Sequence, residues 1–243
     1  MDSTAPIALE GVSYVYGKGA LHMQILFDIS AVIQAGEIII LTEPSGSGKT
    51  TLLTLIGALR STQQGSVRVL DQELNKAREK DLIKVRRQIG YIFKTHNLLD
   101  SLTIRQNVHM AQQLNGVSYR DSKDRVTAVL ARVGLSEYQH KLPGQLSGGQ
   151  KQRAGIARAL VNRPSVILAD EPTASLDKES GRDVVELIQD LAREDSAAVS
   201  EGASRMLNLR EKHDPDSASY LATFAFALAR VAYTDNVVTD SER

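Results

Sequence analysis

Residues 43–53 read EPSGSGKTTLL, a turn rich in glycine and serine that lies between two apolar stretches. Before the turn, residues 38–41 form a run of branched apolar side chains, which is typical of a buried strand in a parallel sheet. After it, residues 47–59 carry apolar side chains at helical spacing. The sequence therefore predicts a strand, a glycine-rich loop and a helix in direct succession, as in an α/β fold.

The predicted loop has the composition of a phosphate-binding site. Gly46 and Gly48 let the backbone wrap so that successive N–H groups face a polyphosphate, and the start of the helix adds its partial positive charge. Lys49 is expected to reach the terminal phosphates, and Thr50 to ligate Mg²⁺ through its hydroxyl. An ordinary surface turn is the alternative, but the strand before the loop and the helix after it favour the phosphate site. The residues expected to bind ATP here are Ser45, Gly46, Ser47, Gly48, Lys49, Thr50 and Thr51.

Two acidic residues follow a second apolar run, VILA at residues 166–169. Asp170 and Glu171 would then lie at the carboxyl end of a strand, where ligands bind in open α/β sheets. Asp170 is expected to hold Mg²⁺, and Glu171 to polarise the attacking water as a general base. Two acids at a strand end are more commonly just solvated, and it is the phosphate loop that favours the catalytic interpretation.

Between these two sites lies LSGGQKQR, at residues 146–153. Ser147, Gly148 and Gly149 come directly before residues 150–162, which have helical apolar spacing. A serine and bare backbone at a helix start form an anion site, although the same pattern alone is that of an ordinary helix cap. The chain therefore carries two candidate phosphate sites.

In this order and spacing, the three segments resemble the motifs of ATP-binding cassette (ABC) ATPases, over residues 7 to about 194. The resemblance implies an α/β P-loop NTPase fold, in which a domain of residues 1–195 combines a mixed core sheet with an antiparallel β edge. It also implies an inserted helical subdomain at about 96–147. The strands expected at the edge are residues 7–16 and 24–33, and the helices expected in the insert are residues 103–114 and 119–133.

Several longer phrases narrow the resemblance. The phrases most similar to ATPase subunits of heterocyst-type glycolipid exporters are ILTEPSGSGKTTLLTLIGALR, HNLLDSLTIRQNV and EPTASLDKESGRDVVELIQDLARE. That subgroup is related to the lipoprotein-release and macrolide-export ATPases. The resemblance further implies that Tyr16 stacks on adenine, that residues 91–94 form the Q-loop, and that residues 174–177 form the D-loop. The alternative for Tyr16 is a tyrosine that only packs.

Three positions depart from the family pattern. Glu43 stands where the loop motif has its first glycine, and a carboxylate there is expected to repel phosphate. Lys94 stands where the family has the glutamine that touches metal and water, so a cation replaces an amide. The family's switch histidine, expected near Ser204, is absent, and His213 is interpreted as an exposed loop residue.

Residues 196–243 form a divergent tail, in which neither the strand nor the switch histidine that would complete the family's sheet is recognisable. Within the tail, residues 220–233 read YLATFAFALARVAY, which we interpret as a helix packed on the sheet. This stretch is shorter than a membrane span needs. The N-terminal residues do not have the pattern of a signal peptide.

The composition fits a cytosolic domain. Its 29 basic and 29 acidic residues balance, so nothing indicates a nucleic-acid partner. The absence of cysteine excludes disulfides and thiolate metal sites.

The expected function is that of an ATP-binding and ATP-hydrolysing subunit, with ATP and Mg²⁺ as cofactors, that energises an ABC export complex for lipid-like cargo. Two copies are expected in a head-to-tail dimer that holds ATP between the loop of one and the SGG segment of the other. Permease subunits would provide the membrane passage, which places the chain in the cytoplasm, on the inner face of the plasma membrane. The alternative is a catalytically impaired ABC-like nucleotide-binding or regulatory protein, because Glu43, Lys94 and the missing histidine all bear on the phosphate site.

Overall fold

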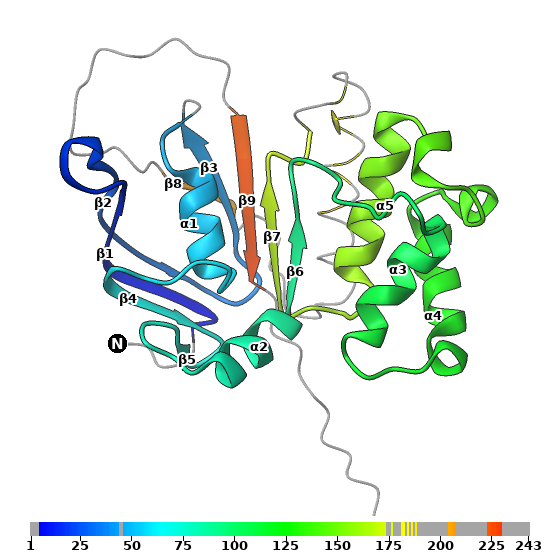
Figure 1. Cartoon of the computed structure of the whole chain (residues 1–243), viewed down its shortest axis with the longest axis horizontal. Coiled ribbons are helices and arrows are strands. Elements are labelled where there is room, and N and C mark those ends of the chain that lie inside the picture. The colour runs from blue at the N-terminus through cyan, green and yellow to red at the C-terminus, as the bar shows by residue number, and fades with distance from the viewer. Residues whose placement is uncertain are drawn as a thin grey trace, which may run out of the picture.

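Two β-sheets and a group of helices make up the protein, as a computed structural model shows (Figure 1). The structure describes residues 5–43, 46–173, 176, 181–182, 184, 186, 188, 204–207 and 223–229. A four-stranded antiparallel sheet lies on one side of helix α1, and a five-stranded mixed sheet lies on the other. Beyond the mixed sheet lie the helices of the insert. This arrangement confirms the predicted α/β fold.

The antiparallel sheet has the strand order β2-β1-β4-β5. Buried side chains alternate along β1, with Ile7 and Leu9 in the core, and a shift of register precedes the next buried pair, Val12 and Tyr14. The two strands predicted for this edge are confirmed, while the other two were not predicted. The strands are β1 (Ile7–Tyr16), β2 (Met23–Ile33), β4 (Gln64–Val69) and β5 (Gln72–Glu73).

The mixed sheet has the strand order β6-β7-β9-β3-β8. Strands β6 and β7 are parallel, β8 is parallel to β3, and β9 runs antiparallel to both of its neighbours, β3 and β7. Every side chain of β7 is buried, as its unbroken apolar run predicts. The strands are β3 (Ile38–Glu43), β6 (Ile89–Ile92), β7 (Val166–Asp170), β8 (Ser204–Leu207) and β9 (Thr223–Ala229).

The described parts of the tail correct two predictions. We predicted a helix over residues 220–233, but β9 is a strand in the middle of the mixed sheet. We also predicted that the tail lacks the strand that would complete the sheet, whereas it supplies both β8 and β9. The sequence of β9, TFAFALA, alternates large and small residues, a period of two that suits a strand. Between β3 and β7 this strand pairs backbone groups that would otherwise lie in an open gap of the sheet.

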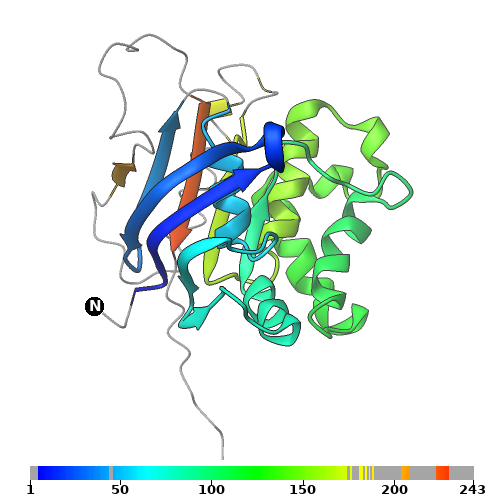
Figure 2. The ribbon, with the colours of Figure 1, turned by 60° about the vertical axis from the view of Figure 1, so that its left-hand side comes forward.

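Helix α1 packs in the larger of two hydrophobic clusters, between the two sheets (Figure 2). Leu52, Leu53 and Leu55 of this helix are all buried at that place. The second cluster lies between the mixed sheet and the insert, whose predicted helical character is confirmed. The helices are α1 (Lys49–Ile56), α2 (Glu79–Arg87), α3 (Ile104–Gln113), α4 (Tyr119–Arg132) and α5 (Gly148–Leu160), with short 3-10 turns at Gly19–Leu21, Ser136–Tyr138 and Pro143–Gln145.

In the parts of the chain that the structure describes, no helix has both the length and the apolar character that a bilayer crossing requires.

Candidate functional site

The glycine-rich loop joins β3 to α1, as predicted. Gly48 is the N-cap of α1 and has a left-handed backbone, with φ of 98° and ψ of 5°. Lys49 follows as the first helical residue and is only 4% exposed. Its ammonium nitrogen lies 3.5 Å from the hydroxyl of the buried Ser47. A buried cation at a helix start, next to N–H groups that lack helical partners, is a strong setting for a phosphate. Ser45 lies outside the described residues.

Thr50 and Asp170 meet at the ends of α1 and β7, although they are 120 residues apart in sequence. The Thr50 hydroxyl donates a hydrogen bond of 3.1 Å to Oδ1 of Asp170. Burial raises the pKa of the Asp170 carboxyl, and the hydrogen bond from Thr50 opposes part of that shift. A hydroxyl and a buried carboxylate that converge in this way match the hard oxygen ligands that Mg²⁺ prefers. The two residues predicted to hold the metal are therefore together, and they fit it.

Glu171 follows β7 and is 8% exposed. Its backbone has φ of 47°, a left-handed conformation that a residue with a Cβ adopts only at a cost. The ammonium of Lys94 forms an ion pair with Oε2 of this carboxylate. Contact with Glu171 raises the pKa of Lys94. The cation that replaces the family's glutamine thus touches the predicted general base itself.

The segment after β6 that carries Lys94 is held at both ends. On its N-terminal side, the rings of Tyr91 and Phe93 stack with centroids 4.3 Å apart. On its C-terminal side, Arg158 of α5 donates hydrogen bonds to the carbonyl oxygens of Asn97, at 2.5 Å, and His96, at 3.0 Å. These contacts tie the segment that follows the predicted Q-loop to α5.

Tyr16 lies beside the phosphate loop but already has protein neighbours. Its hydroxyl is 3.1 Å from Oγ1 of Thr51 in α1, and the guanidinium of Arg60 lies 5.0 Å from its ring centroid. The ring also meets Tyr14 edge to face. The position next to α1 suits a base-binding residue, and adenine stacking on Tyr16 stays a prediction.

Ser147 begins α5 on the other face of the mixed sheet from α1, so one chain does not join the two predicted phosphate sites (Figure 1). The Ser147 hydroxyl accepts a hydrogen bond of 3.3 Å from the N–H of Gln150, whose side chain accepts one from the Ser147 N–H. This reciprocal pair is a capping box. Gly148 is exposed and Gly149 is half-buried, which leaves this backbone open to a ligand.

Some predicted features lie outside the described residues. They include His213 and, in the predicted D-loop, Ala174, Ser175 and Asp177. Glu43 ends β3, where its backbone pairs with Thr223 of β9. The expected repulsion between its carboxylate and a phosphate stays a prediction.

The sequence profile of the ABC transporter family matches residues 26–174. The chain belongs to this family. It is 42% identical, over 187 residues, to the methionine import ATP-binding protein MetN 1 of Salmonella choleraesuis, covering 77% of this chain and 54% of that protein. It is 39% identical, over 193 residues, to the lipoprotein-releasing system ATP-binding protein LolD of Shewanella denitrificans, covering 79% of this chain and 83% of that protein.

A solved structure is similar as well. It is the dimeric post-hydrolysis state of the ATP-binding cassette MJ0796 bound to ADP and Pi, with 33% identity and a TM-score of 0.73, covering 83% of this chain and 87% of that chain. The family, the fold and the relation to lipoprotein-release ATPases that the motifs predicted are thus confirmed. The chain spans about half the length of the MetN 1 relative that it matches.

Proposed function

We propose that this ABC-family chain is the ATP-hydrolysing subunit of a membrane transport complex. The observation that carries the proposal is the hydrogen bond between Thr50 and Asp170, which joins the end of the phosphate loop to the acidic end of β7. Lys49, buried at the same helix start, supplies positive charge for the terminal phosphates. Thr50 and Asp170 would hold Mg²⁺, which, when bound, neutralises charge on the phosphate oxygens.

The reaction is the attack of water on the γ-phosphorus of ATP. An oxygen–phosphorus bond forms to the water oxygen, the bond to the β–γ bridging oxygen breaks, and ADP leaves with that electron pair. Glu171 accepts the proton that the water gives up, while Lys49 stabilises the charge on the transferred group. For this role the Glu171 carboxylate has to face the water rather than Lys94.

A dimer would complete the site. The SGG segment lies on the opposite face of the mixed sheet from the phosphate loop. Its exposed backbone can therefore bind only a nucleotide that is held by another copy of the chain. A head-to-tail pair of chains offers the loop of one copy to Ser147, Gly148 and Gly149 of the other. ATP then holds the pair closed, and hydrolysis removes the γ-phosphate contacts that join the copies.

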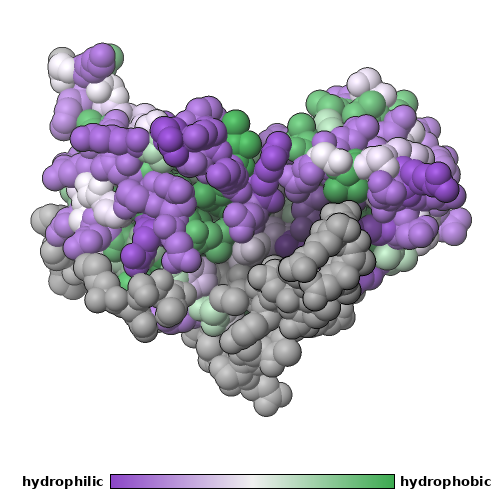
Figure 3. Space-filling model, turned by 90° about the horizontal axis from the view of Figure 1, so that it is seen from below, coloured by the Kyte–Doolittle hydropathy of each residue, from purple (hydrophilic) through white to green (hydrophobic). Residues whose placement is uncertain are grey.

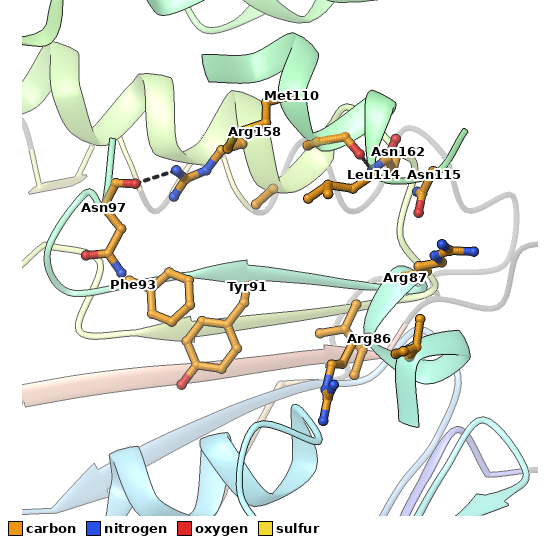
Figure 4. A pocket seen from close by; sticks show the side chains of 14 residues that line it. Arg86, Arg87, Tyr91, Phe93, Asn97, Met110, Leu114, Asn115, Arg158 and Asn162 are labelled. Carbon is orange, nitrogen blue, oxygen red and sulfur yellow. Dashed lines mark hydrogen bonds between the residues drawn. The ribbon is translucent and has the colours of Figure 1, made fainter. Parts of the chain in front are cut away.

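A groove between α2, β6, α3 and α5 offers a place for a permease segment. It encloses about 520 Å³. Figure 4 shows Tyr91 and Phe93 on one side of the groove, Met110 and Leu114 on the other, and two arginines at one end. From below, the surface is hollowed between the two halves of the molecule, with hydrophobic and hydrophilic residues on both sides (Figure 3).

The lining of the groove indicates the chemistry of its occupant. Arg86, Arg87 and Arg158 bring positive charge to it, although Arg86 is paired with Glu79 of α2, and no acidic side chain is among the lining residues that the structure describes. Ile83 and Leu114 leave 40% and 67% of their surface exposed at its rim. We therefore assign it to an amphipathic permease segment that brings apolar residues and an acidic side chain.

For the cargo we propose a lipid-like molecule moved outward, with the chain on the inner face of the plasma membrane, where ATP is available. The similarity to LolD, named for lipoprotein release, supports export. The similarity to MetN 1, named for methionine import, supports the opposite direction. Purifying the chain with its bound membrane subunits and identifying the lipid that stimulates ATP turnover tests the cargo.

A catalytically impaired protein is the second candidate, and the ion pair between Lys94 and Glu171 favours it. In that case the chain binds nucleotide poorly or without turnover, and serves as a regulatory subunit. Glu43 at the loop entrance acts in the same direction.

Equilibrium binding of Mg·ATP to the purified chain, followed by phosphate release, separates the two candidates. We expect saturable binding that Lys49→Ala abolishes, and phosphate release that Glu171→Gln reduces by at least about a hundredfold. A control is Lys84→Gln on α2, which removes an exposed lysine and should leave both measurements unchanged. Binding without phosphate release by the wild-type chain would favour the impaired protein.

A further inference from the structure

The geometry points to Lys94 as a positioning residue that restrains the hydrolytic step by holding the Glu171 carboxylate in an ion pair, without blocking nucleotide binding. This inference rests on the proposed function, since it concerns the general base of that reaction. The contact joins a side chain that is 56% exposed to one that is 9% exposed. The exposed Lys94 side chain therefore extends from the surface to a carboxylate that is buried.

The restraint follows from what Glu171 has to do. As a base, the carboxylate needs a free lone pair directed at the attacking water. A fixed ammonium at Oε2 occupies a carboxylate oxygen and holds the carboxylate in an orientation set by Lys94 rather than by the attacking water. The slowed event is proton transfer from water to Glu171, with bond making and breaking at phosphorus otherwise unchanged.

The hydrogen bonds that join the candidate phosphate and metal residues that the structure describes do not include Lys94, although its charge also acts on Asp170. Ser47 lies in the loop before α1, Lys49 is the first residue of that helix, and the metal pair is Thr50 with Asp170. Nucleotide affinity is therefore expected to survive while turnover is low. Such a chain accumulates in its ATP-bound state.

Lys94 is held where it can act, because the segment that follows it is anchored to α5. Arg158 binds the carbonyl oxygens of His96 and Asn97, and the His96 ring lies 2.7 Å from Oε1 of Gln152 in α5. Arg158 and Asn97 also line the groove assigned to the permease segment (Figure 4). A permease segment that docks in this groove and moves α5 would also move Lys94. Docking could therefore break the ion pair between Lys94 and Glu171.

The test compares Lys94→Gln, which restores the family's amide, with Lys94→Arg, which keeps the cation. We expect Lys94→Gln to raise kcat by about tenfold, the effect of an interaction near 1.4 kcal/mol, and to change the Kd for Mg·ATP by less than about twofold. Lys94→Arg should keep kcat low. Lys84→Gln, which removes an exposed lysine 4.0 Å from Asp81, is the matched control and should change neither value.

A second readout is the dimer population rather than the rate of phosphate release. Sedimentation with Mg·ATP should show dimer accumulating in the wild-type chain, and less dimer in Lys94→Gln, because the closed state is then hydrolysed sooner. A kcat of Lys94→Gln equal to or below that of the wild type would overturn the restraint. Absence of Mg·ATP binding in every variant would overturn the proposed function instead, and this inference with it.

Discussion

Gly46 and Gly48 both have a left-handed backbone in the phosphate loop, with φ of 84° and 98°. Only Gly48 is also crowded, because a Cβ added there would lie 2.7 Å from Cδ2 of Leu26 and 2.8 Å from Cγ2 of Ile25. Around Gly46 no described atom lies within 4 Å of such a Cβ. Both glycines therefore have a left-handed backbone, but only at Gly48 would a Cβ clash with neighbouring atoms.

This difference predicts unequal effects of the same substitution. Gly46→Ala should lower the free energy of unfolding by about 1 kcal/mol, the cost of a left-handed backbone for a residue with a Cβ. Gly48→Ala should lower it by about 3 kcal/mol, because β2 has to shift as well. Urea unfolding of the nucleotide-free chain measures both values. Equal losses would show that contact with β2 is not what keeps position 48 small.

For single residues, the sequence predicted which residues belong to the site better than it predicted which of them contact one another. The meeting of Thr50 with Asp170 could be predicted because strand ends and a helix start gather at one edge of an α/β sheet. The ion pair of Lys94 with Glu171 could not, since a long flexible lysine has many possible partners and only the path of the chain after β6 decides among them. The lysine at position 94, where the family has glutamine, was the one feature of the sequence that pointed to an unusual contact there.

Helices α3 and α4 are joined by a buried polar contact. His109 is 5% exposed, and its Nδ1 lies 2.6 Å from the hydroxyl of Ser122, which is fully buried. Tyr119 meets the imidazole edge to face at 4.7 Å. Nε2 is buried and has no hydrogen-bond partner among the described residues. Burial, and then the charge of Arg105, lower the pKa of His109.

The lowered pKa predicts that the protein loses stability in mild acid. Below pH 6.5, the ordinary pKa of His109, the unfolded chain takes up a proton there, while the folded chain resists it. The contribution is thus fully present above pH 6.5 and is lost as the pH falls towards the lower, folded pKa, at about 1.4 kcal/mol for each unit between the two values.

Urea unfolding from pH 7.5 to 5 checks this prediction. His109→Gln should flatten the pH dependence relative to the wild type, whereas His22→Gln, a change at an exposed position, should leave it unchanged. A pH dependence that stays the same in His109→Gln would assign the acid sensitivity to other groups.

Helices and strands whose apolar residues repeat with a clear period were predicted. Those whose conformation depends on pairing with segments far away in sequence were not. The helices of the insert have polar and apolar faces in sequence, and their predicted ranges agree with α3 and α4 to within a few residues. Strand β9 was predicted as a helix because an alanine-rich apolar stretch suits either state. Pairing with β3 and β7 decides its conformation, and those strands are far away in sequence.

The whole molecule separates the two halves of its nucleotide site. Lys49 lies at α1, packed between the sheets, and Ser147 lies at α5, on the other face of the mixed sheet. A head-to-tail dimer built from one kind of chain therefore has two composite sites, each with a loop from one copy and an SGG segment from the other. The sequence motifs identify both the phosphate loop and the SGG segment, but only the fold shows that the two lie apart within one chain.

This geometry predicts that two inactive variants restore activity when mixed. Lys49→Ala damages the loop, and Ser147→Arg damages the SGG segment, so each variant alone has two defective sites. In a mixed dimer one site combines both defects, and the other combines an intact loop with an intact SGG segment. Equal mixing should therefore recover about a quarter of wild-type phosphate release, since half of the randomly assorted dimers carry one good site of two. The control is each variant mixed with itself, and a mixture no more active than these would contradict the shared site.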